Sequence, residues 1–389
     1  MVCAAFPRHA APHLGLTGCG PGRIYAAPVI KYLGSKRTLV PALGDIAVAA
    51  GARTAVDLFT GTTRVAQEFK RRGLFVTAAD LASYSTVLSD CYIATDADTV
   101  DLAVLDAELA RLAALPGRRG YFTETFCERA RFFQPRNGER VDAVRDAIEH
   151  DHPPGSPLRP LLLTSLMLAA DRVDSTTGVQ MAYLKSWAPR ALGELDLRRP
   201  DLLPGGGATE DGDVLATVDR LPAVDLVYVD PPYNQHRYFA NYHIWETLVR
   251  WDAPEHYGIA CKRVDTREQR SAFNSRRTMP DALTDVLSRV RADVAVVSYN
   301  DESWIAPGQM TAILRDAGHR EVAVLAFDRK RYVGAQIGIH GPTGQRVGEV
   351  GRLRNVEYVF VAGDPDRVEA AVAAGVAAGS GLSVPMPQR

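Results

Sequence analysis

Asp225-Leu-Val-Tyr-Val-Asp-Pro-Pro-Tyr233 is the stretch that decides the fold, because an apolar strand ends there in a rigid loop. Two consecutive prolines fix their φ angles and have no N–H group to donate, so the strand cannot continue past Asp230. Open α/β sheets bind ligands at the carboxyl ends of their strands. A carboxylate, carbonyl oxygens and the Tyr233 ring at such an end suit a planar amino group on an aromatic base. The same four residues also fit a stiff loop without function, so other parts of the sequence are needed to distinguish the two interpretations.

Short runs rich in Val, Ala and Tyr alternate along the chain with longer helical patterns. This alternation is typical of parallel strands joined by crossover helices. The predicted strands are 54–59, 74–79, 226–229, 293–299, 321–327 and 356–362. Most of them are nearly continuous in apolar side chains, as expected of strands covered on both faces. The fold class is therefore α/β.

A long interruption of this alternation predicts an inserted helical subdomain. Helical patterns follow one another at 101–115, 123–132, 141–148 and 160–171. The glycine-rich segment 203–210 is then predicted to be a flexible return to the sheet. The chain is thus divided into a main domain at 27–100 and 206–365, a helical insertion at 101–205, and tails at 1–26 and 366–389.

Composition is that of a globular protein with little overall charge. The net charge is -1, so a polyanion would have to be held by local clusters of Lys and Arg. The five cysteines show no CxxC spacing, which argues against a disulfide framework and a zinc site. We therefore expect no metal and a reducing, cytoplasmic location. No apolar run is long enough to predict a membrane span, and the first 26 residues do not resemble a signal peptide.

A second ligand-binding turn is predicted after the first strand. In Asp57-Leu-Phe-Thr-Gly-Thr-Thr-Arg64, Gly61 lies between a strand and the amino terminus of a helix, where a small residue lets the backbone approach a ligand. The full glycine patterns of dinucleotide and P-loop sites are missing. Asp80 ends the second strand, where ribose hydroxyls are commonly held, although an isolated Asp there is also a common helix cap.

Three motifs carry a family resemblance, namely Lys31-Tyr-Leu-Gly-Ser-Lys36, Asp57-Leu-Phe-Thr-Gly61 and Asp230-Pro-Pro-Tyr233. In this order they resemble the D12 class of adenine-specific DNA methyltransferases. Segments 234–246, 297–302 and 355–360 also resemble that family, the first of them its type II restriction-modification branch. The resemblance implies a Rossmann-like S-adenosylmethionine-dependent methyltransferase sheet with a target-recognition subdomain at 101–205. It also implies methyl transfer from S-adenosylmethionine to N6 of a flipped-out adenine in DNA.

The resemblance also implies roles for individual residues. The implied catalytic residues are Asp230, Pro231, Pro232 and Tyr233, where Asp230 and the Pro231 carbonyl hold the amino hydrogens and Tyr233 stacks on the base. The implied cofactor site comprises Tyr32, Gly34 and Lys36 near the methionine end, Asp57, Phe59 and Gly61 in the pocket wall, Asp80 at the ribose and Asp213 at the adenine. The short motif around Asp213 also fits a plain turn. Tyr32, Thr60 and Thr62 depart mildly from the family pattern.

Local basic segments are the expected contacts to double-stranded DNA. The predicted DNA-binding residues are Lys262, Arg263, Arg270, Arg276, Arg277 and Arg331, although such runs are usually solvated loops. The insertion is expected to read the sequence through Arg118, Arg119, Arg129, Arg131, Arg136 and Arg140. A cognate restriction endonuclease is a further expected partner if the chain serves a restriction-modification or phage-defence system.

Two alternatives remain open from the sequence. One is the same chemistry on RNA or on a glutamine side chain. The other is a DNA-binding module without activity on a methyltransferase fold. Asp at position 230 and the order of the motifs favour adenine in DNA, and the intact Asp230, Gly61 and Lys36 argue against loss of activity.

Overall fold

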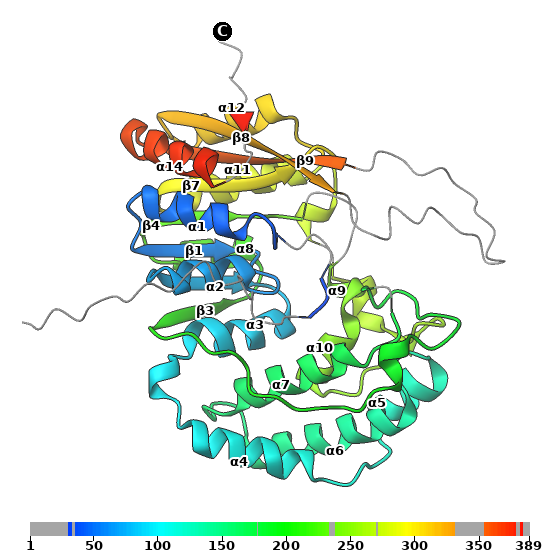
Figure 1. Cartoon of the computed structure of the whole chain (residues 1–389). Helices are drawn as coiled ribbons and strands as arrows, with labels where there is room; N and C mark the ends of the chain where they lie inside the picture. The colour runs from blue at the N-terminus through cyan, green and yellow to red at the C-terminus, as the bar shows by residue number, and fades with distance from the viewer. Residues whose placement is uncertain are drawn as a thin grey trace, which may run out of the picture.

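A computed structural model describes residues 30–32, 36–176, 178–232, 238–269, 271–330, 354–378 and 382–383 of the chain. It is built on one eight-stranded sheet in the order β10-β8-β9-β7-β4-β1-β2-β3 (Figure 1). The strands are β1 (Thr54–Leu58), β2 (Phe75–Asp80), β3 (Gly207–Asp211), β4 (Val224–Val229), β7 (Ala292–Asn300), β8 (Glu321–Lys330), β9 (Arg354–Gly363) and β10 (Leu382–Ser383). All six predicted strands are confirmed to within three residues at each end.

Strand direction differs from the prediction at one side of the sheet. β3, β2, β1, β4 and β7 are parallel, as the alternation predicted. β9 lies between β7 and β8 and runs antiparallel to both. An apolar run marks a buried strand but does not encode its direction, so the sequence pattern could not reveal this reversal. The parallel half forms a Rossmann-like sheet whose carboxyl ends meet at one edge.

Alternate side chains of each central strand enter two hydrophobic cores on opposite faces of the sheet. Leu226 and Tyr228 of β4 belong to one core, and Val227 and Val229 belong to the other. The first core is covered by α1 (Val40–Ala49), α2 (Arg64–Arg71) and α14 (Pro365–Ala377). The second is covered by α8 (Val214–Thr217), α11 (Met279–Arg289) and α12 (Pro307–Asp316).

The prediction of a C-terminal tail from residue 366 is wrong as far as residue 377. This segment forms α14, which packs against α1 and buries Val368 and Ala371. A side chain at Gly375 would come within 2.5 Å of Leu325, so the helix lies very close to the sheet. Alanine and glycine give this helix only a narrow apolar stripe, and such a stripe is sufficient where two elements approach this closely.

The flexible return predicted at 203–210 is also only partly correct, because residues 207–211 form the edge strand β3 beside β2. A Cβ atom at Gly207 would lie 2.5 Å from the Ile93 carbonyl oxygen, so glycine is needed for this pairing. Glycine suggested flexibility in the sequence, whereas here it permits close approach of two backbones.

The insertion is helical, as predicted, and it packs directly on the main core. It contains α4 (Leu102–Ala113), α5 (Tyr121–Thr123), a π-helix at Glu124–Arg129, α6 (Pro135–Asp151) and α7 (Arg159–Arg172). Helix α7 lies against α3 (Ser83–Ser89) and α10 (His243–Arg250), while α6 packs on α7 and α4 on α6 (Figure 1). The short α9 (Tyr238–Asn241) and α10 follow the Asp230 loop. A small hairpin of β5 (His256–Tyr257) and β6 (Lys262–Arg263) follows α10. Within the described ranges, no helix has the length and apolar character needed to cross a bilayer.

Candidate active site

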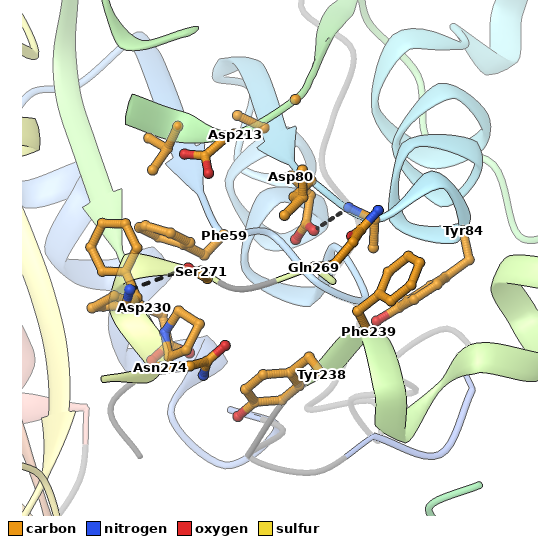
Figure 2. A pocket seen from close by; sticks show the side chains of 18 of the residues that line it. Phe59, Asp80, Tyr84, Asp213, Asp230, Tyr238, Phe239, Gln269, Ser271 and Asn274 are labelled. Atoms are coloured by element: carbon orange, nitrogen blue, oxygen red, sulfur yellow. Dashed lines mark hydrogen bonds between the residues drawn. The ribbon is translucent and has the colours of Figure 1, made fainter. Parts of the chain in front are cut away.

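A pocket of about 1080 Å³, open to solvent, lies where β1, β2 and β4 end. Seven of the predicted site residues line it, namely Tyr32, Phe59, Asp80, Asp213, Asp230, Pro231 and Pro232. Figure 2 shows the side chains of Phe59, Asp80, Asp213 and Asp230 around the same space. Gly34 and Tyr233 lie outside the described residues. The Asp230 loop and the glycine turn after β1 therefore meet in one cavity.

The turn after β1 has an unusual backbone. Phe59, Gly61 and Thr63 have φ angles of 63°, 54° and 61°, in the left-handed region that favours glycine. A Cβ atom at Gly61 would also come within 3.2 Å of the Tyr32 ring. Strained backbone at two residues other than glycine persists only where the surrounding structure holds it, and it is concentrated at functional sites.

Asp57 holds this turn in place through two hydrogen bonds. Its Oδ2 accepts hydrogen bonds from Thr60 Oγ1 at 2.8 Å and from the Ala66 backbone N–H at 3.0 Å. Burial raises the pKa of Asp57 to about 8, against the lowering effect of the Thr60 hydrogen bond. Asp57 therefore joins the end of β1 to the first turn of α2 and fixes where Gly61 lies.

Asp80 and Asp213 present carboxylates to the pocket from neighbouring strand ends. Asp80 Oδ2 accepts a hydrogen bond from the Gly61 backbone N–H at 2.8 Å, and its Oδ1 accepts one from the Ala82 backbone N–H at 3.0 Å. Burial raises the pKa of Asp80, and these backbone hydrogen bonds lower it. Asp213 Oδ1 accepts a hydrogen bond from Leu215 at 2.9 Å and so caps α8. Asp213 is thus both a capping residue and part of the pocket wall.

The Asp230 carboxylate is held by Lys36, which precedes α1. Lys36 Nζ lies 3.1 Å from Asp230 Oδ1 and also forms an ion pair with Glu357 Oε1 on β9. Lys36 and Glu357 are buried, and the Asp230 side chain is 20% exposed toward the pocket. Burial raises the pKa of Asp230 to about 6, while Lys36 lowers it and Glu357 raises it. Lys36 was predicted near the cofactor, and the structure places its ammonium on the predicted catalytic carboxylate.

Aromatic rings form the remaining wall. The Tyr32 ring stacks on Tyr242 at 4.6 Å and on Tyr238 at 5.4 Å between ring centres. Phe59 meets Phe273 edge to face at 4.8 Å. Tyr238 lines the pocket, whereas Tyr242 is buried in the core. Such a wall can stack on the planar ring of a base.

Several pocket residues were missed in the sequence. They are Tyr84, Phe239, Gln269, Ser271, Phe273 and Asn274, together with Glu357 behind Asp230. Gln269 and residues 271–274 follow no recognisable motif and reach the pocket only through the path of the chain after the hairpin. Phe239 and Glu357 had a signal, because each belongs to a segment that resembles the family.

One predicted DNA contact is wrong. Arg263 is 1% exposed, and its guanidinium binds Asp252 at 2.6 and 2.7 Å and Asp265 at 2.8 Å. It joins the hairpin to the segment after α10 and is closed to phosphate. Lys262 is half-buried on β6, and Arg276 and Arg277 are exposed without an ion pair among the described residues. Arg270 and Arg331 lie outside those residues.

The arginines of the insertion all bind groups of their own chain. Arg118, Arg119 and Arg129 pair with carboxylates, and Arg131, Arg136 and Arg140 donate to backbone carbonyls. The first three side chains are more than half exposed, so these pairs contribute little to stability and can exchange partners at low cost. Their role in reading DNA stays a prediction.

Comparisons with known proteins agree with this geometry. Type II methyltransferase M.NlaIII of Neisseria lactamica is 29% identical over 286 residues, which are 70% of this chain and 82% of that protein. Modification methylase StsI of Streptococcus sanguinis is 26% identical over 311 residues, 74% of this chain, and the match spans 46% of that longer protein. Type II methyltransferase M.CviAII of Paramecium bursaria Chlorella virus 1 is 27% identical over 277 residues, 69% of this chain and 81% of that protein. Residues 32–313 match the family described as D12 class N6 adenine-specific DNA methyltransferase, and the chain belongs to this family.

Proposed function

We propose that this chain is a site-specific DNA methyltransferase that transfers a methyl group from S-adenosylmethionine to N6 of a flipped-out adenine. The observation that carries the proposal is the shared pocket of the Asp230 loop and the Gly61 turn. A donor site and an acceptor site in one cavity allow direct transfer, because positioning the two reactants supplies much of the rate. Family membership supports the choice of adenine and of DNA.

S-adenosylmethionine is the cofactor of this family, and the residues around the glycine turn fit it. Asp80 offers carboxylate oxygens beside the pocket, as a ribose requires. Asp57 interacts electrostatically with Asp80 and Asp230, and its buried Oδ1 has no hydrogen-bond partner among the described residues. Buried oxygens of this kind are normally satisfied, so a cationic ligand group nearby would complete the site. When bound, the cofactor supplies an activated methyl group.

Asp230 would act on the adenine amino group. Its carboxylate accepts a hydrogen bond from N6–H and thereby favours the pyramidal nitrogen that attacks the methyl group. With the methyl group supplied by bound S-adenosylmethionine, Asp230 would take up the proton that leaves the amino group and pass it to solvent. A carboxylate whose pKa is raised to about 6 by burial is ionised at neutral pH and suits this role.

DNA binding has to offset the cost of extruding the base, which is a few kcal/mol. Arg276 and Arg277 are exposed and follow the pocket wall at 271–274, so we propose that they hold phosphates of the substrate. We further propose that residues 101–205 read the target sequence. By analogy with relatives named type II methyltransferases, the chain would protect DNA in the cytoplasm beside a cognate endonuclease.

Long-read sequencing of DNA from cells that express the chain tests this function. We expect N6-methyladenine at one short sequence motif, and none in cells with the Asp230→Ala variant. Transfer of labelled methyl to purified RNA but not to DNA would favour the RNA alternative. Tight DNA binding without S-adenosylmethionine binding in calorimetry would favour a module without activity. Either result would overturn the proposal.

A further inference from the structure

Three charged side chains from distant parts of the chain meet behind the Asp230 loop. Lys36 precedes α1, Asp230 follows β4, and Glu357 lies on β9. Lys36 Nζ is 3.1 Å from Asp230 Oδ1 and pairs with Glu357 Oε1 as well. Lys36 is 5% exposed and Glu357 is 8% exposed, so water competes little with these contacts. The three side chains form one buried ionic cluster.

This cluster carries more negative than positive charge. One ammonium faces two carboxylates, so one negative charge is in excess when both acids are ionised. Among the described residues, Tyr228 of β4 and Asp57 of β1 also interact electrostatically with Asp230, and neither brings positive charge. An ion pair of Lys36 and Asp230 alone would be neutral and less costly to bury. A second buried carboxylate at this place therefore points to a function.

We propose that Glu357 is a positioning residue for methyl transfer, which holds the Lys36 ammonium so that Lys36 fixes Asp230 without cancelling its charge. The proposal rests on the function proposed above. A lysine paired with Asp230 alone would compete with the adenine amino group for the carboxylate. Because Glu357 shares the ammonium, Asp230 keeps charge available for the positive charge that develops on N6. Burial raises the pKa of Asp230, Lys36 lowers it, and Glu357 raises it, which agrees with this division of charge.

Replacement of Glu357 by glutamine keeps its size and removes its charge. We expect kcat of Glu357→Gln to fall about tenfold, the loss expected when a charged hydrogen bond is removed. We also expect the acidic limb of the kcat profile to move to lower pH, because Glu357 no longer raises the pKa of Asp230. A residue that only supported β9 would lower the melting temperature and leave the limb in place. Glu369→Gln on the exposed face of α14 is the matched control and should change neither kcat nor the limb.

A double-mutant cycle shows whether Glu357 acts through Lys36. In a Lys36→Met background, we expect Glu357→Gln to have no further effect on kcat. The conservative variant Glu357→Asp keeps the charge, and we expect it to retain the acidic limb of the wild type even if the shorter side chain lowers kcat. Equal loss in both backgrounds, or an unchanged limb in Glu357→Gln, would overturn the inference. Wild-type transfer to adenine in the same assay separates the two failures, since its absence would instead refute the proposed function.

Discussion

Two clusters of buried charge differ in how well they are matched. Where the hairpin meets the segment after α10, the Arg263 guanidinium makes bidentate contacts with Asp252 and also binds Asp265. Arg250 lies 3.1 Å from Asp252 and 3.3 Å from Asp265, so two cations face two carboxylates there. Burial raises the pKa of Asp252, but the Arg263 hydrogen bonds outweigh it, so that pKa lies below its usual value.

In the pocket wall, burial raises the pKa of Asp230 to about 6 and raises the pKa of Asp80 as well, and behind that wall it raises the pKa of Asp57 to about 8. Matched charges fix a shape, whereas excess carboxylates beside a cavity are available for a ligand and for proton transfer.

The largest expected effect comes from removing the central carboxylate of the pocket. Asp230→Ala should lower kcat at least about 1000-fold, because the amino group loses the acceptor that stabilises its developing charge. The melting temperature and the affinity for S-adenosylmethionine should stay close to those of the wild type. Single-turnover transfer of labelled methyl to DNA measures the first quantity, and calorimetry measures the second. Appreciable turnover in this variant would remove Asp230 from the mechanism.

Removal of the Arg263 charge, which is matched by its partners, should lower the stability of the fold and not the rate of methyl transfer. Arg263→Met is expected to lower the free energy of unfolding by about 3 kcal/mol, the lower part of the range for a broken buried ion pair. The lower value is appropriate because Asp252 and Asp265 are 30% and 31% exposed and can regain water.

Urea unfolding measures this change. Arg267→Met is the control, because Arg267 is exposed and only covers the Tyr257 ring at 3.8 Å, so its loss should be about 0.5 kcal/mol. A large fall in kcat of folded Arg263→Met would contradict the view that this cluster serves stability and not catalysis.

The raised pKa of Asp230 should also determine how turnover depends on pH. Asp230 is active as a carboxylate, and its pKa of about 6 means that this form is lost as the pH falls through 6. We expect kcat to fall about tenfold for each pH unit below that value and to be flat above it. The rate should be measured with saturating DNA and cofactor, after a check that the protein stays folded. A flat profile down to pH 5 would show that the Asp230 proton plays no part.

The sequence predicted correctly those features that depend on the local conformation of the backbone. The proline pair after Asp230 and the glycine after β1 fix turns by themselves, and strand ends in an α/β sheet share one edge. These features pointed to the sheet edge where Asp80 and Asp230 lie, whereas the place of Asp213 came only from the family resemblance. The helical insertion was equally visible, because its apolar periodicity does not depend on what it packs against.

Long-range pairing was not visible in the sequence. Arg263 looked like a DNA contact because its partners Asp252 and Asp265 are brought to it only by the packing of the hairpin on α10. Glu357 meets Lys36 across 321 positions of the chain, a distance over which a single sequence gives no coupling. Whether a charge is matched or in excess is therefore a property of the tertiary structure.

A smaller effect is expected from Asp80, which offers only part of the cofactor site. Asp80→Asn should weaken S-adenosylmethionine binding roughly tenfold to 100-fold, the equivalent of one charged hydrogen bond. The asparagine oxygen can still accept from Gly61, so the turn should survive. Calorimetric titration measures the affinity, with Asp316→Asn on the exposed side of α12 as the control. Unchanged affinity would place the ribose elsewhere in the pocket.

The smallest expected effect concerns the exposed cations after the pocket wall. The double substitution Arg276→Ala with Arg277→Ala should raise KM for DNA a few-fold and reduce the slope of log affinity against log salt by about 2. Neither kcat at saturating DNA nor stability should change, because both side chains are exposed and form no ion pair with described residues.

The matched control is Arg315→Ala with Arg320→Ala, two exposed cations in the last turn of α12 and just before β8, at the edge of the sheet opposite the pocket. If the control pair reduces the salt slope as much as the first pair does, DNA is held by the overall positive charge of the surface. The proposed phosphate contacts of Arg276 and Arg277 would then be wrong. If only the first pair acts, the exposed unmatched cations, and not the buried Arg263, form the DNA contact after the catalytic loop.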